Sequence, residues 1–253
     1  MKIAIDVSGL DQARQDLVAR FSDRRLRAAM ATAATRTVRE LARGWEQQVG
    51  QAFDRPTPAT QRAVRTTMAT AANLTAEVAV KDVAQGGAAP VEWLLPEERG
   101  GARSIKRFEQ ALQSQGAMPR GWRAVPGPGA KLDAYGNVSR GQIVQVIAQL
   151  GAQYSPGYAR VISKSAAKRA ASAARRGRAY VAILPGNGQK RTPGVYERKG
   201  RGLLPVFIYV QAVQYRKRLR LLDAARDDAG GILRRELTRA VDESAARLAA
   251  RGG

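Results

Sequence analysis

The chain contains no cysteine and no histidine among its 253 residues. Without cysteine it has no disulfide scaffold and no thiol nucleophile. Without histidine it lacks the side chain best suited to proton transfer near neutral pH, and both absences together remove the usual zinc ligands and the usual base of a catalytic triad. We therefore expect no enzyme activity, no catalytic residue, no cofactor and no metal site.

Acidic side chains are scarce. The chain has 43 Lys and Arg against 21 Asp and Glu, which gives a formal net charge of +22 and a sequence pI near 11.3. Such a field attracts polyanions, of which nucleic acid is the commonest and an anionic membrane surface the second. A GC-rich coding sequence would explain the preference for arginine over lysine, but it would not explain the shortage of acids. The charge therefore indicates a partner.

Long hydrophobic runs are missing as well. The first six residues lack a secretory hydrophobic stretch, and no run reaches the length needed to cross a bilayer. We therefore expect synthesis in the cytoplasm and no membrane partner. The apolar fraction of 44% is nevertheless ordinary for a globular protein, so a packed core is expected.

Hydrophobic periodicity predicts two long amphipathic helices, at about residues 23–53 and 215–248. Alternation of apolar and polar residues predicts strands at 2–7 and 73–80. A further helical pattern covers residues 10–21. The expected fold class is α+β, with a small mixed or antiparallel sheet packed with the two long helices, because the alternation of a doubly wound sheet is missing.

The middle of the chain predicts shorter elements. Ser104 can cap a helix, and Ser139 with Gln142 resembles a capping box before another. Residues 180–184 and 203–210 predict strands, and Pro205 suggests that the second begins at a sheet edge. Two further stretches, 119–136 and 185–200, are predicted as a turn-rich loop and as a basic hairpin or loop.

Residues 152–178 differ from the rest in composition, because they are rich in Ala, Ser, Arg and Lys and poor in large apolar side chains. We predict one α+β domain formed by residues 1–151 and 179–253, with 152–178 as a basic insertion or arm.

The basic segment is the strongest functional signal. Seven cations between residues 160 and 178 have no acid among them, and the run extends to Arg198, Lys199 and Arg201 against Glu197 alone. Such an arm can neutralise phosphates, and seven contacts would give a log–log salt slope of about −6 on duplex DNA. The alternative is a disordered or solvated insertion that contacts an acidic neighbouring protein. The candidate DNA or partner contacts are Arg160, Lys164, Lys168, Arg169, Arg175, Arg176, Arg178, Lys190 and Arg191.

Other patterns are weaker. Gly127–Lys131 (GPGAK) lacks the spacing of a phosphate-binding loop and the Ser or Thr after its lysine. The acid pairs Glu97–Glu98, Asp227–Asp228 and Asp242–Glu243 are better explained by solvated faces and helix charge balance than by Mg²⁺. The three tryptophans are expected to anchor a core or an interface.

An ordered set of blocks resembles the minor tail protein Z family of tailed bacteriophages, also called tail completion proteins. The blocks are FDRPTP at 53–58, ANLTA at 72–76, KRFE at 106–109 with Ala111 and Leu112, VPG at 125–127, GAKLD at 129–133 and YGNVSRGQI at 135–143. The likeness covers residues 25–150 well, and the part after 179 weakly.

This resemblance implies a non-enzymatic virion protein at the head-proximal end of the tail, near the neck, which completes the tail and helps head–tail joining. It implies a ring-like homo-oligomer such as a hexamer, contacts with other phage neck and tail proteins, and genomic double-stranded DNA in the channel. Its basic loops would face DNA or acidic subunits.

Two rival functions belong to other classes. The first is a free non-sequence-specific nucleic-acid-binding protein, which would coat DNA outside particles and be absent from virions. The second is a Mg²⁺-dependent nuclease, which would need carboxylates that converge in space and activity that a chelator abolishes.

Overall fold

The computed structural model describes residues 1–6, 23–83, 88–150, 180–186 and 190–250. The chain divides into two compact units. Unit 1 comprises Met1–Gly100 with Arg216–Gly253, and unit 2 comprises Gly101–Tyr215. Helices accompany sheets in which every strand pair is antiparallel, so the α+β prediction is confirmed.

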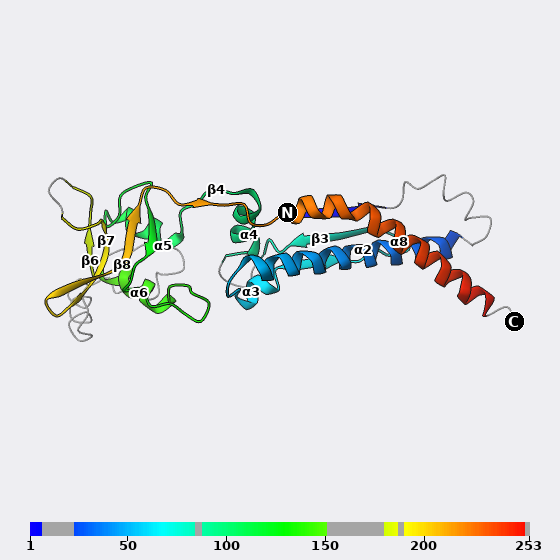
Figure 1. Cartoon of the computed structure of the whole chain (residues 1–253), viewed down its shortest axis with the longest axis horizontal. Helices are drawn as coiled ribbons and strands as arrows, with labels where there is room; N and C mark the ends of the chain where they lie inside the picture. Colours follow the sequence, from blue (N-terminus) through cyan, green and yellow to red (C-terminus); the bar gives the residue numbers. More distant parts are fainter. Residues whose placement is uncertain (7–22, 84–87, 151–179, 187–189, 251–253) are drawn as a thin grey trace. The chain divides into compact units, whose positions relative to one another are not determined.

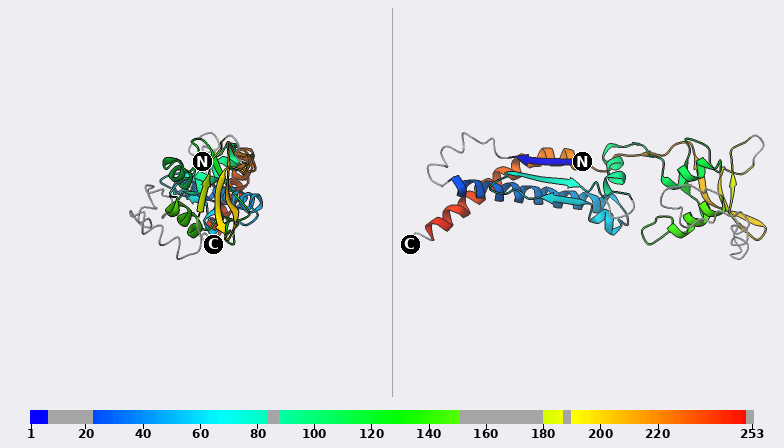
Figure 2. Two further views of the ribbon diagram at one scale, coloured as in Figure 1. Left: turned by 90° about the vertical axis from the view of Figure 1, so that its left-hand side faces the viewer. Right: turned by 180° about the vertical axis from the view of Figure 1, so that it is seen from behind.

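Unit 1 combines a three-stranded sheet with two long helices (Figure 1). Its elements are β1 (Lys2–Asp6), α2 (Asp23–Ala52), α3 (Pro58–Gln61), β2 (Val64–Thr67), β3 (Thr75–Val80), α4 (Pro90–Arg99) and α8 (Leu221–Ala249). The sheet order is β1-β3-β2, and the sheet lies against α2, as the right panel of Figure 2 shows. The two long helices predicted from periodicity are thereby confirmed.

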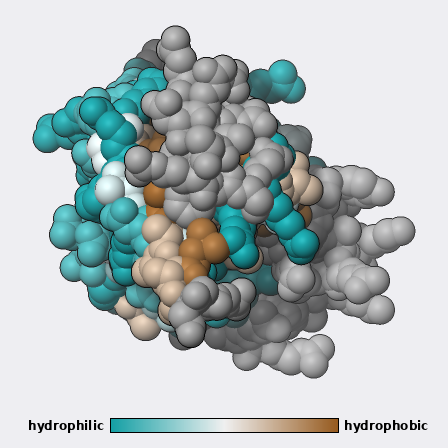
Figure 3. Space-filling view, turned by 90° about the vertical axis from the view of Figure 1, so that its right-hand side faces the viewer, coloured by the Kyte–Doolittle hydropathy of each residue, from teal (hydrophilic) through white to brown (hydrophobic). Residues whose placement is uncertain are grey.

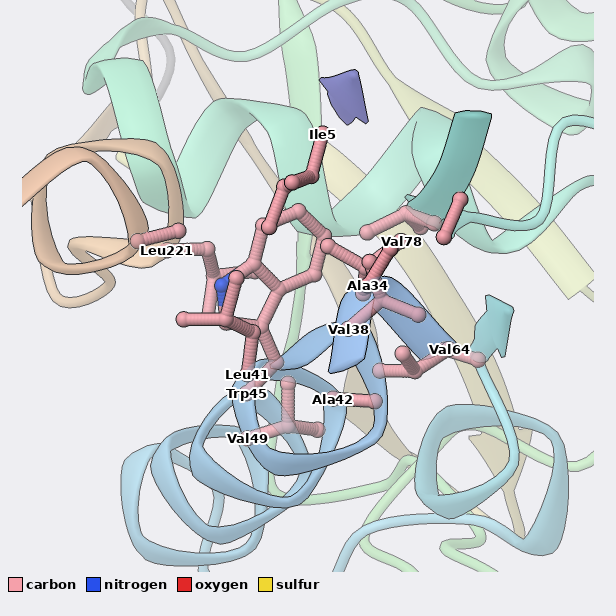
Figure 4. Close-up of a cluster of buried hydrophobic side chains, with 14 of the residues drawn as sticks. Ile5, Ala34, Val38, Leu41, Ala42, Trp45, Val49, Val64, Val78 and Leu221 are labelled. Carbon is pink, nitrogen blue, oxygen red and sulfur yellow. The ribbon is translucent and has the colours of Figure 1, made fainter. Parts of the chain in front are cut away.

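The core of unit 1 forms around the apolar stripe of α2. Seven apolar residues recur along this stripe every three or four positions, and all of them are buried: Leu26, Met30, Ala34, Val38, Leu41, Trp45 and Val49. Trp45 is 1% exposed and lies among side chains of α2, β1, β3 and α8 (Figure 4). This tryptophan is therefore a core residue, one of the two roles expected for it.

Ion pairs join α2 to α8 on the outside of this core. Arg36 donates to both carboxylate oxygens of Glu243, at 3.1 and 2.9 Å. Arg235 donates to both oxygens of Glu40, at 2.8 and 2.6 Å. In the view of Figure 3 the described residues are coloured mainly as hydrophilic, with small hydrophobic areas between them.

The start of α8 is fixed by α4. Arg218 donates to both carboxylate oxygens of Glu97, each at 2.7 Å. The buried carboxylate of Glu98 accepts from the backbone N–H groups of Leu221 and Leu222, at 2.7 and 3.2 Å. These are N–H groups of the first turn, which lack partners inside the helix. The helix therefore begins at Leu221 and not near 215 as predicted.

Unit 2 is built on a four-stranded antiparallel sheet of order β5-β8-β7-β6. Its elements are β4 (Gly101–Ala102), α5 (Arg107–Ser114), β5 (Arg123–Pro126), α6 (Arg140–Gln149), β6 (Tyr180–Ile183), β7 (Gly194–Lys199), β8 (Gly202–Val210) and β9 (Gln214–Tyr215). β4 and β9 form a separate pair where the chain enters and leaves the unit.

The core of unit 2 lies between the sheet and α5 and α6. Phe108 of α5 meets Phe207 of β8 with ring centroids 5.1 Å apart. The Tyr209 hydroxyl donates to Ala117 O at 2.8 Å, and burial raises the pKa of this hydroxyl. It therefore stays protonated and serves as a structural donor.

Three local predictions need correction. Pro205 lies on β8, an interior strand, opposite Tyr196, where the register with β7 shifts. A bulge tolerates proline as an edge does, so the edge prediction was wrong. The N-cap of α5 is Lys106 and not Ser104 as predicted. The Glu109 carboxylate accepts a hydrogen bond from the backbone N–H of Lys106 at 2.7 Å. The predicted loop at 119–136 contains β5, whereas at 185–200 the hairpin alternative holds, because β7 pairs with β6.

The capping prediction at α6 is half confirmed. Ser139 Oγ accepts from Gln142 N at 3.3 Å, as predicted. The Gln142 side chain does not return to the cap, because its Oε1 accepts from Lys131 N at 2.6 Å and its Nε2 donates to Gly129 O at 3.0 Å. It therefore anchors the preceding loop.

The predicted domain of residues 1–151 and 179–253 thus comprises both compact units. Its folding as one cooperative domain stays a prediction. The predicted helix at 10–21 and the predicted insertion at 152–178 lie outside the described residues.

Candidate nucleic-acid interface

The excess positive charge is concentrated in unit 2. Residues 101–215 hold 19 Lys and Arg against three Asp and Glu, a net charge of +16. The remaining residues hold 24 Lys and Arg against 18 Asp and Glu, a net charge of +6. Unit 2 is the shorter of the two, so its charge density is several times higher.

Two of the three acids of unit 2 are buried, and Asp133 alone adds an exposed carboxylate to its surface. Glu109 is fully buried, where it accepts from both Nη atoms of buried Arg103 and from Ala124 N at 2.8 Å. Glu197 is 2% exposed on β7. Asp133 is exposed, but its Oδ1 accepts from Tyr135 N and Asn137 N, each at 2.9 Å, and so holds a turn. The exposed cations of this unit therefore have few carboxylates near them.

A hairpin presents three of these cations together. β7 and β8 are joined at Lys199 and Gly202 through Gly200, whose φ of 56° suits glycine. The hairpin tip, defined as Arg198, Lys199 and Arg201, is exposed. Among the described residues, none of its three side chains forms an ion pair with a carboxylate. This tip can therefore meet an external anion without breaking an internal contact.

The predicted basic segment joins the sheet at the same end. Tyr180, where β6 begins, pairs with Glu197, two residues from the Lys199–Gly202 pair that closes the hairpin. Tyr180 N also donates to Gln149 Oε1 at 2.9 Å, which brings the end of α6 to the start of β6. The described residues on either side of 151–179 thus lie close together. The predicted contacts Arg160, Lys164, Lys168, Arg169, Arg175, Arg176 and Arg178 lie outside the described residues.

The two remaining predicted contacts lie elsewhere. Lys190 and Arg191 are exposed in the connection between β6 and β7, beyond the Ile183–Gly194 pair. That connection is at the opposite end of β7 from the hairpin tip, and a six-residue strand spans about 17 Å. Lys190 and Arg191 are therefore separated from the other predicted contacts. The hairpin tip, and not these two residues, lies near Tyr180, the first described residue after 151–179.

Lys131 is a cation near this end that sequence reasoning did not include. Gly129 N donates to Pro205 O at 2.8 Å, and a Cβ at Gly127 would lie 2.5 Å from the same oxygen. The glycines thus let the loop run along β8 beside the hairpin. The spacing of these glycines marks the loop in the sequence, but it does not show that the loop lies beside the hairpin.

The same contacts explain why Gly127–Lys131 is no phosphate loop. Gly127 N donates to Val206 O at 2.9 Å and Ala130 N donates to Gly127 O at 2.9 Å. With Gly129 N and Lys131 N also engaged, these N–H groups are used by the sheet and by Gln142. A phosphate would have to compete with the fold for its donors.

Other chemistry finds no support in the described part of the chain. No group of three Asp or Glu converges there in a way that could hold a metal ion. Glu97 and Glu98 are buried and bind the start of α8, so the interpretation of this pair as a solvated face was wrong, whereas Glu243 of α8 binds Arg36. None of the described helices combines the length and the apolar character that a membrane crossing requires.

Comparison with protein-family models, with curated proteins and with solved structures gave no match for this chain.

Proposed function

We propose that the chain is a structural protein of a tailed-phage virion that completes the head-proximal end of the tail and helps to join the tail to the head. In this role it makes a ring-like homo-oligomer and contacts other neck and tail proteins, and the hairpin tip of unit 2 faces duplex DNA or an acidic subunit. The ordered sequence blocks at 53–143 support the virion context.

One observation carries the choice of partner. Unit 2 has a net charge of +16, and two of its three carboxylates are buried. An uncompensated field of this size repels other copies unless a polyanion or acidic subunits screen it. A protein lining a channel for DNA has such a screen in place.

The structural role is tested on purified particles. We expect mass spectrometry to find the chain in virions and images of the neck to place it where head and tail meet. Particles assembled without the chain should contain unjoined heads and tails. Its absence from virions, together with coated DNA outside them, would favour the free nucleic-acid-binding protein instead.

The DNA-facing role needs its own test. Replacing Arg175, Arg176 and Arg178 together with Glu should weaken binding of duplex DNA in vitro and lower the yield of infectious particles. If both are unchanged while the chain is still found in virions, the structural role stands and the contact of these residues with DNA is wrong.

A further inference from the structure

The sheet of unit 1 has an open edge at β2. In an antiparallel pair, successive residues alternate between directing their N–H and C=O groups to the partner strand and away from it. Lys81 N donates to Ala63 O at 2.8 Å, which sets the phase of this alternation. Val64 and Thr66 therefore direct their backbone groups outward, and no strand of the described residues pairs with them.

A groove of ≈ 290 Å³ runs between this edge and α2. It is lined by Arg39, Ala42, Arg43, Glu46, Val64, Arg65 and Thr66. Val64 and Ala42, both labelled in Figure 4, belong to the core beneath it. The groove thus has an apolar floor, a backbone edge on one side and helix side chains on the other.

The helix and the strand run antiparallel along this groove. Ala69 N donates to Thr35 Oγ1 at 3.1 Å, and Arg39 Nη2 contacts Met68 Sδ at 3.0 Å. Helix residues four apart rise about 6 Å, and strand residues two apart rise about 6.6 Å. Arg39 and Arg43 are therefore spaced like alternate residues of an extended chain laid beside β2.

The groove is electropositive. Its lining residues include three arginines and one acid, Glu46. Arg65 has a carboxylate, that of Asp82, only at 4.0 Å, and both side chains are largely exposed. A basic segment would be repelled here, whereas a segment with carboxylates would gain charge-assisted hydrogen bonds.

We propose that this groove binds an extended segment of another protein, which adds a strand to the sheet at β2 and directs carboxylates at alternate positions toward Arg39 and Arg43. Strand addition at an open edge is a general mode of peptide recognition. A second copy of this chain fits poorly, because none of its described strands carries two carboxylates. The inference concerns unit 1 and does not depend on the role proposed for unit 2.

The test uses the full chain and a fluorescein-labelled capped peptide of alternating glutamate and valine. The double variant Arg39→Glu with Arg43→Glu should weaken binding by about tenfold or more, a loss of at least about 1.4 kcal/mol. The matched control, Arg226→Glu with Arg234→Glu on α8, makes the same charge change at exposed sites and should leave the affinity within about twofold. Failure of the peptide to bind the unmodified chain, or equal weakening by both double variants, overturns the proposal.

A second measurement tests the strand pairing. Hydrogen exchange should show that the peptide protects the amides of Val64 and Thr66, and Thr66→Pro should weaken binding whereas Thr66→Ala should not, since only proline removes the N–H. If a peptide of alternating lysine and valine binds as tightly, or the two amides gain no protection, the proposed mode is wrong.

Discussion

Unit 1 pairs several of its arginines with carboxylates that hold α2, α4 and α8 together, whereas unit 2 buries most of its few carboxylates and leaves the cations of its hairpin tip in solvent. Arg36 with Glu243 and Arg235 with Glu40 show the first use, since each closes two hydrogen bonds between helices. Arg198, Lys199 and Arg201 show the second.

This difference shows that arginine has two roles in this chain: it forms ion pairs within the fold of unit 1, and it supplies exposed positive charge on unit 2. Guanidinium groups with an internal carboxylate have their charge balanced by the fold, and the net charge of +6 on unit 1 reflects that balance. The net charge of +16 on unit 2 has no such internal balance, and we propose that a polyanion or acidic subunits supply it. The net charge of the whole chain, +22, does not reveal this difference between the two units.

The largest expected effect comes from Glu109→Ala in unit 2. The substitution leaves Arg103 buried without a counter-charge and leaves Lys106 N and Ala124 N without this acceptor. We expect a loss of about 3–5 kcal/mol in the free energy of unfolding, because an uncompensated buried charge is costly. Urea unfolding measures this loss of stability, and hydrogen exchange on the same variant shows which segments of the chain open.

Glu109→Gln is the control, since it keeps the shape and one acceptor oxygen, and it should lose less. Opening confined to residues 101–215 would mean that the two units unfold separately, and equal opening throughout would confirm the predicted single domain. An unchanged free energy of unfolding would contradict the structural role given to the Arg103–Glu109 pair.

A smaller effect is expected from Glu98→Ala in unit 1. The carboxylate satisfies two N–H groups at the start of α8 and carries negative charge where the helix dipole favours it. Loss of a capping acceptor costs about 1–2 kcal/mol, which thermal or chemical unfolding can measure. Glu46→Ala, which removes the same charge from an exposed position, should change stability by less than about 0.5 kcal/mol. Equal effects of the two substitutions would rule out a capping role.

The smallest effect concerns pH and the Arg36–Glu243 pair. The hydrogen bond from Arg36 lowers the pKa of Glu243 below its ordinary value of 4.5. Because the folded-state pKa is the lower one, the contribution to stability is complete above pH 4.5 and is lost as pH falls through the folded-state pKa. The melting temperature of the unmodified chain should therefore exceed that of Glu243→Gln at neutral pH and approach it in acid. Asp242→Asn is the control, and a difference that persists or grows in acid would contradict the prediction.

Sequence reasoning succeeded where local periodicity decides structure. The stripe from Leu26 to Val49 predicted α2 and its buried face, because helix burial follows a fixed spacing. It missed β2 and did not give the bounds of β7 within the predicted hairpin or loop, because the residues of these strands do not alternate cleanly. Val195, Tyr196 and Glu197 are buried in succession on β7, a pattern set by the neighbouring strands and by the register shift opposite Pro205.

The candidate interface was predictable in kind but not in position. A run of cations in sequence does not reveal which of them share an end of a sheet. Strand register decides that, and it separates Arg191 from Lys199 along β7. The burial of Glu109 and Glu197 was equally out of reach, since their partners come from contacts that composition does not encode.

The most direct test of the difference between the units is the salt dependence of duplex-DNA binding by the full chain. The variant with Glu at Arg198, Lys199 and Arg201 should make the log–log slope less negative by about 3, which corresponds to three lost phosphate contacts. The matched variant with Glu at Arg24, Arg226 and Arg234, all exposed in unit 1, should leave the slope unchanged. Equal slopes for the two variants would contradict the assignment of the polyanion to unit 2.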